Sequence, residues 1–275
     1  DLPRGYNPAR RLIFGHGGRF TMRFQDKVAV ITGAADGIGR ATSRILAGEG
    51  AHLVAVDINP AALAALAEEI ETGGGSVTTM EVNVLDSQQA EGMVDSVVSS
   101  LGRIDILVNA VGGSTIIPNS RATVDDLTLE DWDNIIDFNL RGTFLCTNAV
   151  IKRMKQQGIG KIINLSSVAG HGATDTSSAY ATAKAGIMAF TKKVAVEAGP
   201  YGVTCNAIAP GMTLSDRILR GWEQRSEEEK RRSIEAIPLG RPAEPEDQAK
   251  VIAFLASSDA DYVTGVTIDV NGGQY

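Results

Sequence analysis

Short apolar segments rich in β-branched residues recur along the chain from residue 27 onward. Each is four to eight residues long and is bounded by polar or glycine-rich sequence, which is typical of strands buried on both faces of a sheet. The predicted strands are residues 27–32, 53–56, 77–84, 104–108, 161–165, 203–208 and 267–270.

Helical patterns separate these predicted strands. They cover residues 40–49, 61–70, 87–101 and 131–157. Asn59-Pro60 supports the second helix, because proline fits the first turn, where its missing N–H would have no partner. Strands that alternate with helices predict an α/β fold: one doubly wound parallel sheet of seven strands, with helices on both faces and right-handed connections.

The charge is distributed unevenly between the first residues and the rest. Residues 1–22 carry four arginines and one aspartate, a net charge of +3, so that the remainder carries −10 of the total of −7. We expect residues 1–22 to be a disordered leader or extension. Without a repeat, a low-complexity tract or a linker, residues 23–275 are expected to form a single domain.

Composition excludes several functional classes. No apolar run approaches the length of about 18 residues that a transmembrane helix needs, so no membrane association is expected. The two cysteines are not in a CxxC pair, which favours a reducing, cytoplasmic location. A sequence pI near 5.1 argues against a nucleic-acid partner. The three histidines lie far apart without ligand spacing, so no metal site is expected.

A glycine-rich turn directly follows the first predicted strand and opens a helix. It reads Thr32-Gly33-Ala-Ala-Asp36-Gly37-Ile38-Gly39. Glycines let the backbone approach a pyrophosphate, and the helix N-terminus offers free N–H groups, so a Rossmann-type dinucleotide site is expected here.

Asp57 identifies the expected dinucleotide. It ends the second predicted strand, where a carboxylate can accept hydrogen bonds from a ribose 2′-hydroxyl and would repel a 2′-phosphate. Asp36 and Ile58 provide no basic partner for a phosphate. The expected cofactor is therefore NAD.

Tyr180 and Lys184 stand four residues apart and share one face of a helix. A nearby ammonium favours the phenolate and lowers the pKa of the tyrosine, which suits general acid/base catalysis near neutral pH. Ser167 follows the fifth predicted strand, at the edge of the sheet where α/β proteins bind ligands. Asn139 lies within the predicted helix 131–157.

Together these motifs resemble the short-chain dehydrogenase/reductase family over about residues 25–274. The matching segments are the glycine-rich turn, Asn109-Ala-Val-Gly112, Asn139, Ser167, Tyr180 with Lys184, Pro210-Gly211, Tyr262-Val-Thr-Gly265 and Asn271-Gly-Gly273. Four positions depart from the usual family sequence, namely Asn83, Ala110, Val111 and Asn271.

The resemblance implies an oxidoreductase that transfers hydride between NAD(H) and a secondary alcohol or ketone. Tyr180 would be the general acid/base, Lys184 would lower its pKa and bind the nicotinamide ribose, Ser167 would orient the substrate oxygen, and Asn139 would hold a relay water. The implied cofactor-binding residues are Gly33, Asp36, Gly37, Ile38, Gly39, Asp57, Ile58, Asn83, Val84, Asn109, Tyr180, Lys184, Pro210, Gly211, Thr213 and Ser215.

Two other functions fit the same motifs less well. A 3-oxoacyl-[acyl-carrier-protein] reductase would typically use NADPH and carry a basic residue near position 36 or 58. A non-catalytic nucleotide-binding regulator would have no need of the four candidate catalytic residues.

Residues 212–237 are expected to form a mobile lid over the substrate. Leu214, Ile218 and Trp222 recur at helical spacing and predict an apolar inner face, which favours a small, mainly uncharged substrate. A carboxylate would need a basic partner, for which Arg217 and Arg220 are the nearest candidates. The exact substrate, the direction of the reaction and its stereochemistry stay open.

The family resemblance also implies a homotetramer. In that assembly the helices at 131–157 and about 178–198 would pair across an interface. Ile187, Phe190 and Val194 are the apolar side chains that would form the seam, unless they belong to the core of the monomer.

Overall fold

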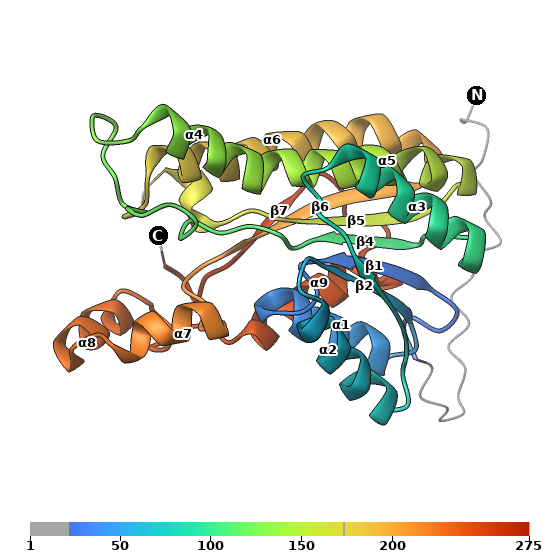
Figure 1. Ribbon diagram of the computed structural model, residues 1–275, viewed down its shortest axis with the longest axis horizontal. Coiled ribbons are helices and arrows are strands. Elements are labelled where there is room, and N and C mark those ends of the chain that lie inside the picture. The colour runs from blue at the N-terminus through green and yellow to red at the C-terminus, as the bar shows by residue number, and fades with distance from the viewer. Residues whose placement is uncertain (1–21, 173, 275) are drawn as a thin grey trace.

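A seven-stranded, all-parallel sheet forms the centre of the molecule (Figure 1). The computed structural model describes residues 22–172 and 174–274, so the expected leader, apart from Met22, lies outside the described residues. The strand order is β3-β2-β1-β4-β5-β6-β7. The strands are β1 (Val28–Thr32), β2 (His52–Asp57), β3 (Ser76–Glu81), β4 (Ile106–Asn109), β5 (Gly160–Leu165), β6 (Val203–Pro210) and β7 (Thr267–Val270).

Helices cover both faces of the sheet, as expected. In Figure 1, α3, α4, α5 and α6 lie above it, and α1, α2 and α9 lie below. The helices are α1 (Gly37–Gly48), α2 (Pro60–Thr72), α3 (Ser87–Leu101), α4 (Leu129–Ile136), α5 (Gly142–Gln157), α6 (Ser178–Ala198), α7 (Asp216–Glu223), α8 (Glu227–Glu235) and α9 (Pro245–Ala256). Among the described residues, none of the helices combines the length and the apolar character that crossing a membrane requires.

Alternation along the strands divides the core into two layers. In β1, Ala29 and Ile31 pack with helices α1, α2 and α9, whereas Val28 and Val30 pack with α3, α5 and α6. Every residue of β1, β4 and β5 is buried. Continuous apolar strands are therefore required here, because both sides of each strand face a helix layer.

Three local differences from the sequence prediction have clear causes. β3 ends at Glu81 rather than at residue 84, because the Asn83 side chain accepts a hydrogen bond from the Leu85 N–H and turns the chain. The helix predicted over 131–157 contains a π-helical turn, Asp137–Arg141, between α4 and α5. α9 is absent from the prediction, although Pro245 and a capping box mark its start.

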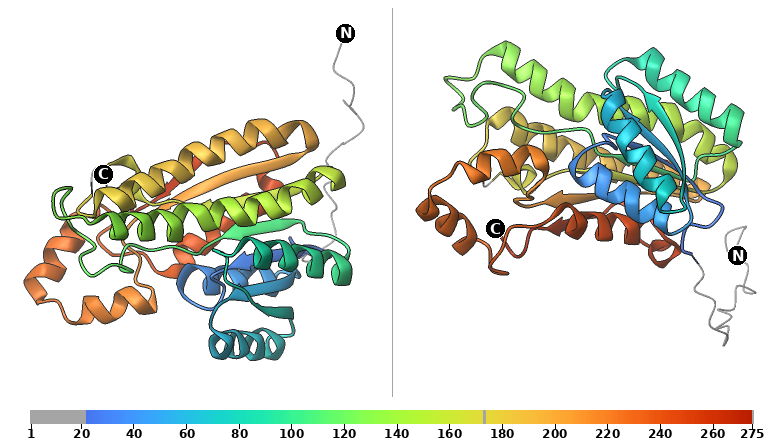
Figure 2. Two further views of the ribbon diagram at one scale, coloured as in Figure 1. Left: turned by 45° about the horizontal axis from the view of Figure 1, so that its top comes forward. Right: turned by 60° about the horizontal axis from the view of Figure 1, so that its bottom comes forward.

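The segment between β6 and α9 stands apart from the sheet. Both views in Figure 2 show α7 and α8, in orange, projecting from the end of the sheet. Neither helix contains a buried residue. The segment is attached at its base, where the Ala243 N–H donates to the Met212 carbonyl and the Leu239 N–H to the Gly272 carbonyl.

Candidate active site

A cavity of about 1030 Å³ opens at the carboxyl ends of the strands. It lies where the strand order reverses, because β1 has β2 on one side and β4 on the other. This topological switch point is where open α/β sheets bind ligands. The described cavity wall includes the segments that follow β1, β2, β4, β5 and β6, together with residues of α7 and α8.

The glycine-rich turn forms one end of this cavity. Gly33 has a φ of +62°, in the left-handed region that favours glycine. A Cβ on Gly39 would overlap the Gly33 carbonyl oxygen, so the helix can start this close to the strand only with glycine there. No side chain caps the N-terminus of α1, and Gly37, Ile38 and Gly39 line the cavity. Its free N–H groups therefore suit an anionic ligand.

Asp57 is held beside this turn. Its carboxylate accepts hydrogen bonds from the N–H groups of Ala35 and Asn59, both at 3.2 Å. Asp36 and the exposed Ile58 line the same end of the cavity. Asp36 and Asp57 give this end of the cavity negative charge, and Ile58 provides no cation that could neutralise a phosphate.

Ser167, Tyr180 and Lys184 line the other part of the same cavity. Ser167 follows β5, and its hydroxyl accepts the Ala169 N–H at 3.2 Å. Tyr180 and Lys184 project from α6, with the Lys184 ammonium 5.6 Å from the centre of the Tyr180 ring. The ammonium is buried and donates to the Leu165 carbonyl at 2.9 Å. The pairing predicted from the sequence spacing is therefore present.

Burial perturbs both titratable groups. It raises the pKa of the Tyr180 phenol, while a hydrogen bond with Ser167 and the charge of Arg217 act in the opposite direction. Burial, helped by the charge of Arg217, lowers the pKa of Lys184 from 10.5 to about 7. The charge of Arg217 thus acts on the phenol from the lid segment, and that Lys184 lowers the pKa of Tyr180 stays a prediction.

Asn139 lies behind the cavity wall, fully buried in the π-helical turn. Its amide oxygen accepts the Gly113 N–H at 2.9 Å, and its amide nitrogen donates to the carbonyls of Gly113 and Ile135, both at 3.0 Å. The side chain therefore fixes the loop that follows β4. That it also holds a relay water stays a prediction.

The other expected cofactor residues line the cavity, with one exception. Asn109 is buried at the end of β4, where its amide donates to Thr147 and Asn164. Asn83, Val84, Pro210, Gly211, Thr213 and Ser215 are all part of the wall. The Thr213 hydroxyl already forms hydrogen bonds with the Gly211 carbonyl and with Gln248. The Ser215 hydroxyl, in contrast, forms no capping hydrogen bond at the start of α7.

The part of residues 212–237 that faces the cavity differs from the expected apolar stripe. Ile218 lines the cavity, but Leu214 and Trp222 do not. The Trp222 ring instead packs against the Arg225 guanidinium, 5.4 Å from its centre. Arg121, Arg217, Arg225 and Arg232 contribute to the wall, and only Arg217 among them was considered in the sequence.

Within residues 22–172 and 174–274, no cluster of three or more His, Cys, Asp or Glu side chains is arranged to hold a metal ion. The polar side chains of the cavity are hydroxyls, carboxylates, amides, arginines and the amine of Lys184. The chemistry that they offer is proton transfer and anion binding.

Comparison with known proteins gives a consistent set of relatives. Residues 33–274 match the family described as enoyl-(acyl carrier protein) reductase. The 3-oxoacyl-[acyl-carrier-protein] reductase FabG of Thermotoga maritima is 40% identical over 256 residues, which cover 92% of this chain and 99% of that protein. D-threitol dehydrogenase of Mycolicibacterium smegmatis is 37% identical over 92% of this chain and 95% of its own length.

Levodione reductase of Leifsonia aquatica is similar in both sequence and structure. It is 37% identical over 92% of this chain and 96% of its own length. A crystal structure of levodione reductase superimposes with a TM-score of 0.83 at 35% identity, over 91% of this chain and 98% of that one.

The lowered pKa of Lys184 predicts a pH-dependent stability. Between pH 7 and 10.5 the unfolded chain binds more protons at this lysine than the folded protein, so the free energy of unfolding rises with pH, by about 1.4 kcal/mol per pH unit from this group. Lys184→Met removes that contribution. Urea unfolding of the protein alone from pH 6.5 to 9.5 should show a flatter dependence on pH for the variant.

Lys192→Met, at an exposed position on the same helix, is the matched control and should keep the slope of the unmodified protein. Parallel curves for Lys184→Met and the unmodified protein would contradict the lowered pKa.

Proposed function

Because the chain belongs to the short-chain dehydrogenase/reductase family, we propose that it is an NAD(H)-dependent enzyme that interconverts a secondary alcohol and a ketone. As a member of this family it is an oxidoreductase that acts on a carbonyl or alcohol group. The observation that carries the finer proposal is that one cavity is lined by Ser167, Tyr180 and Lys184 at one end and by the glycine-rich turn and Asp57 at the other.

The described residues fit a nicotinamide dinucleotide. The glycine-rich turn and the uncapped N-terminus of α1 would hold the pyrophosphate, because they bring N–H groups close to it. Asp57 would accept hydrogen bonds from the adenosine ribose, and Asn83 and Val84 would border the adenine. Ser215 is better suited than Thr213 to hold the carboxamide, since its hydroxyl is free of a capping bond. When bound, the nicotinamide supplies or accepts the hydride.

Side chains of the protein would transfer the proton to or from the substrate oxygen. Tyr180 would donate a proton to the substrate oxygen during reduction and remove it during oxidation, while Ser167 orients that oxygen. Lys184 uses one N–H for the Leu165 carbonyl, which leaves the others free for the nicotinamide ribose. Asn139 would act indirectly, because its side chain holds the Gly113 backbone that forms the floor of the site.

We also propose that residues 212–237 form a lid on a single domain. Its attachment at Met212–Ala243 and at Leu239–Gly272 would leave α7 and α8 free to move as a unit. Neither helix has a buried residue, so little apolar contact opposes such a movement. Closure would exclude water from Tyr180.

The second candidate is a 3-oxoacyl-[acyl-carrier-protein] reductase, which the name of the Thermotoga maritima relative supports. Asp36 and Asp57 beside the nucleotide end of the cavity argue against the NADPH that such an enzyme typically uses. The two candidates differ in cofactor and in the size of the substrate, so kinetic measurements separate them.

A homotetramer is the proposed assembly, with a revised interface. Ile187 and Val194, which were expected to form its seam, are buried in the core of the protomer. Phe144 on α5 is 47% exposed and meets Phe190 on α6 edge-on, with ring centres 6.2 Å apart. Together with the exposed Val196, these rings provide the apolar surface along α5 and α6.

NADH should be preferred over NADPH by about 100-fold or more in kcat/KM, because the Asp57 carboxylate would face the 2′-phosphate. Asp57→Ala should narrow the preference by about tenfold. Steady-state rates with both cofactors test this. Asp95→Ala removes the same charge from the exposed face of α3 and should leave the preference unchanged. A preference of the unmodified enzyme for NADPH would contradict the proposal.

Tyr180→Phe should bind NADH normally and lose about 10²–10⁴-fold in kcat, because it lacks the general acid/base. NADH binding is measured by fluorescence and turnover by absorbance. Tyr201→Phe, at a half-exposed tyrosine after α6, is the matched control. A residual activity of Tyr180→Phe within a few-fold of that of the control would exclude the proposed role.

Light scattering at micromolar concentration should give the mass of four chains. Phe144→Glu should shift the protein to smaller species, because burying an unpaired charge in the interface is costly. Val124→Glu introduces the same charge at an exposed position outside α5 and α6 and should leave the mass unchanged. A monomer in the unmodified protein would refute the assembly.

A further inference from the structure

Arg217 occupies an unusual position for a side chain of the lid. It extends from the first turn of α7 into the cavity, where its guanidinium donates to the Gly112 carbonyl at 3.1 Å. It also lies against Gly113, so closely that a Cβ there would come within 2.6 Å of a guanidinium nitrogen. Arg217 therefore joins the lid to the floor of the active site.

This position is next to the candidate catalytic groups. A Cβ on Gly112 would lie 2.9 Å from the Lys184 ammonium, so Lys184 and Arg217 border consecutive residues of one loop. The charge of Arg217 also affects both Tyr180 and Lys184. The guanidinium is thus close to the place where the carbonyl of a substrate would lie.

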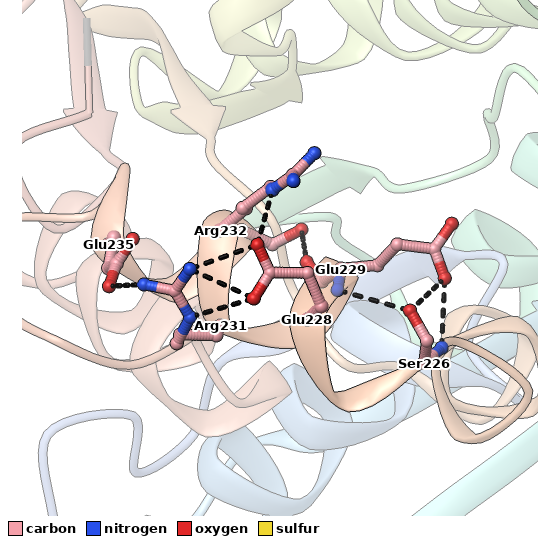
Figure 3. A network of polar contacts seen from close by, with 7 residues as sticks. Ser226, Glu228, Glu229, Arg231, Arg232 and Glu235 are labelled. Atoms are coloured by element: carbon pink, nitrogen blue, oxygen red, sulfur yellow. Dashed lines mark hydrogen bonds and ion pairs between the residues drawn. The ribbon is translucent and has the colours of Figure 1, made fainter.

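Arg217 has no acidic partner among the described residues. Within the described part of the chain its guanidinium donates to one main-chain carbonyl, although a guanidinium has five N–H donors. Two other arginines of the cavity wall do have partners: Arg232 pairs with Glu228 at 2.8 Å, as Figure 3 shows, and Arg121 pairs with Asp175 at 3.2 Å. The side chain of Arg225 contacts Ser233 and Trp222.

Charge is therefore separated along the cavity. Asp36 and Asp57 lie at the end expected to hold adenosine, whereas Arg217 and Arg225 lie on the wall formed by the lid. A neutral substrate would leave the Arg217 guanidinium without a counter-ion when the lid excludes water, which is energetically costly. An anionic substrate would remove this cost through charge-assisted hydrogen bonds.

We propose that Arg217 binds a carboxylate of the substrate, so that the enzyme acts on a hydroxy acid and the corresponding keto acid. This inference rests on the proposed function and specifies its substrate class. The carboxylate lies a few bonds from the reacting carbonyl, because Arg217 borders the same loop as Lys184. The contact also couples recognition to closure, since the cation is carried by the lid.

A phosphopantetheine-linked substrate fits this position less well. Its phosphate is separated from the reacting 3-oxo carbonyl by the thioester and the whole pantetheine arm. With the 3-oxo carbonyl at Tyr180, the phosphate would lie far from Arg217, which borders the carbonyl site itself. Arg217 therefore favours a compact acid over a carrier-bound thioester.

The test compares keto acids with their neutral amides, for example acetoacetate with acetoacetamide and levulinate with levulinamide. The unmodified enzyme should prefer the acid of at least one pair by tenfold or more in kcat/KM. In Arg217→Gln, KM for that acid should rise by about 10–100-fold, because a charge-assisted hydrogen bond is lost. The amide should be affected much less, and Arg217→Lys should restore part of the preference.

Arg220→Gln is the matched control, since Arg220 lies on the same helix but outside the cavity wall. It should behave like the unmodified enzyme. Calorimetric binding of the keto acid to the protein with NAD⁺ provides a readout that needs no turnover. Its Kd should rise in Arg217→Gln by the same factor as KM.

Four results would overturn the inference. The activity of Arg217→Gln could fall equally with the acid and with the amide, which would show that Arg217 only holds the lid in place. The Kd for NADH could rise with KM, which would make it a cofactor contact. Acetoacetyl-coenzyme A could be the preferred substrate in an Arg217-dependent manner, with the acids inactive. Amides could be preferred throughout. Failure of every carbonyl substrate with NADH would instead contradict the proposed function, while acid binding would still test Arg217.

Discussion

The seven strands of the sheet all run in the same direction, and this places all of their carboxyl ends at one edge of the sheet. Because β1 pairs with both β2 and β4, the connections leave in opposite directions from this point, and the loops separate to form the cavity. The key residues lie at or just after the strand ends: Gly33 after β1, Asp57 as the last residue of β2, Gly112 after β4, Ser167 after β5 and Ser215 after β6. The site is thus assembled from parts that are remote in sequence.

The floor of the site depends on side chains that bind main-chain groups. Asn139 holds Gly113, Lys184 holds the Leu165 carbonyl and Arg217 holds the Gly112 carbonyl. Main-chain carbonyls orient these groups but carry no net charge. The buried Lys184 and the exposed Arg217 therefore border consecutive residues of one loop, where the charge of Arg217 acts against the effect of burial on the pKa of Tyr180 and is available to an anionic ligand group.

Much of the fold was predictable because its signals are local. The buried strands are continuous apolar runs, and the glycine-rich turn and the Tyr180–Lys184 spacing each occupy a few adjacent residues. Contacts across the cavity left no such signal. Nothing in the sequence near Arg217 indicates that it reaches Gly112, and apolar spacing on α6 could not distinguish an interface from the core that buries Ile187. The π-helical turn around Asn139 was also missed, because its flanks retain helical periodicity.

That π-helical turn has a consequence for how the protein can vary. An extra residue in a helix offsets the phase of everything that follows by about 100°. The flanking helices α4 and α5 are adjusted to this offset: Ile135 packs with α6 residues on one side, while Cys146 and Val150 face the sheet on the other. Losing one residue from Asp137–Arg141 would restore a regular helix and also rotate one of these faces out of the core. The position of Asn139 is therefore fixed by the packing of two helices, whatever chemistry the side chain performs.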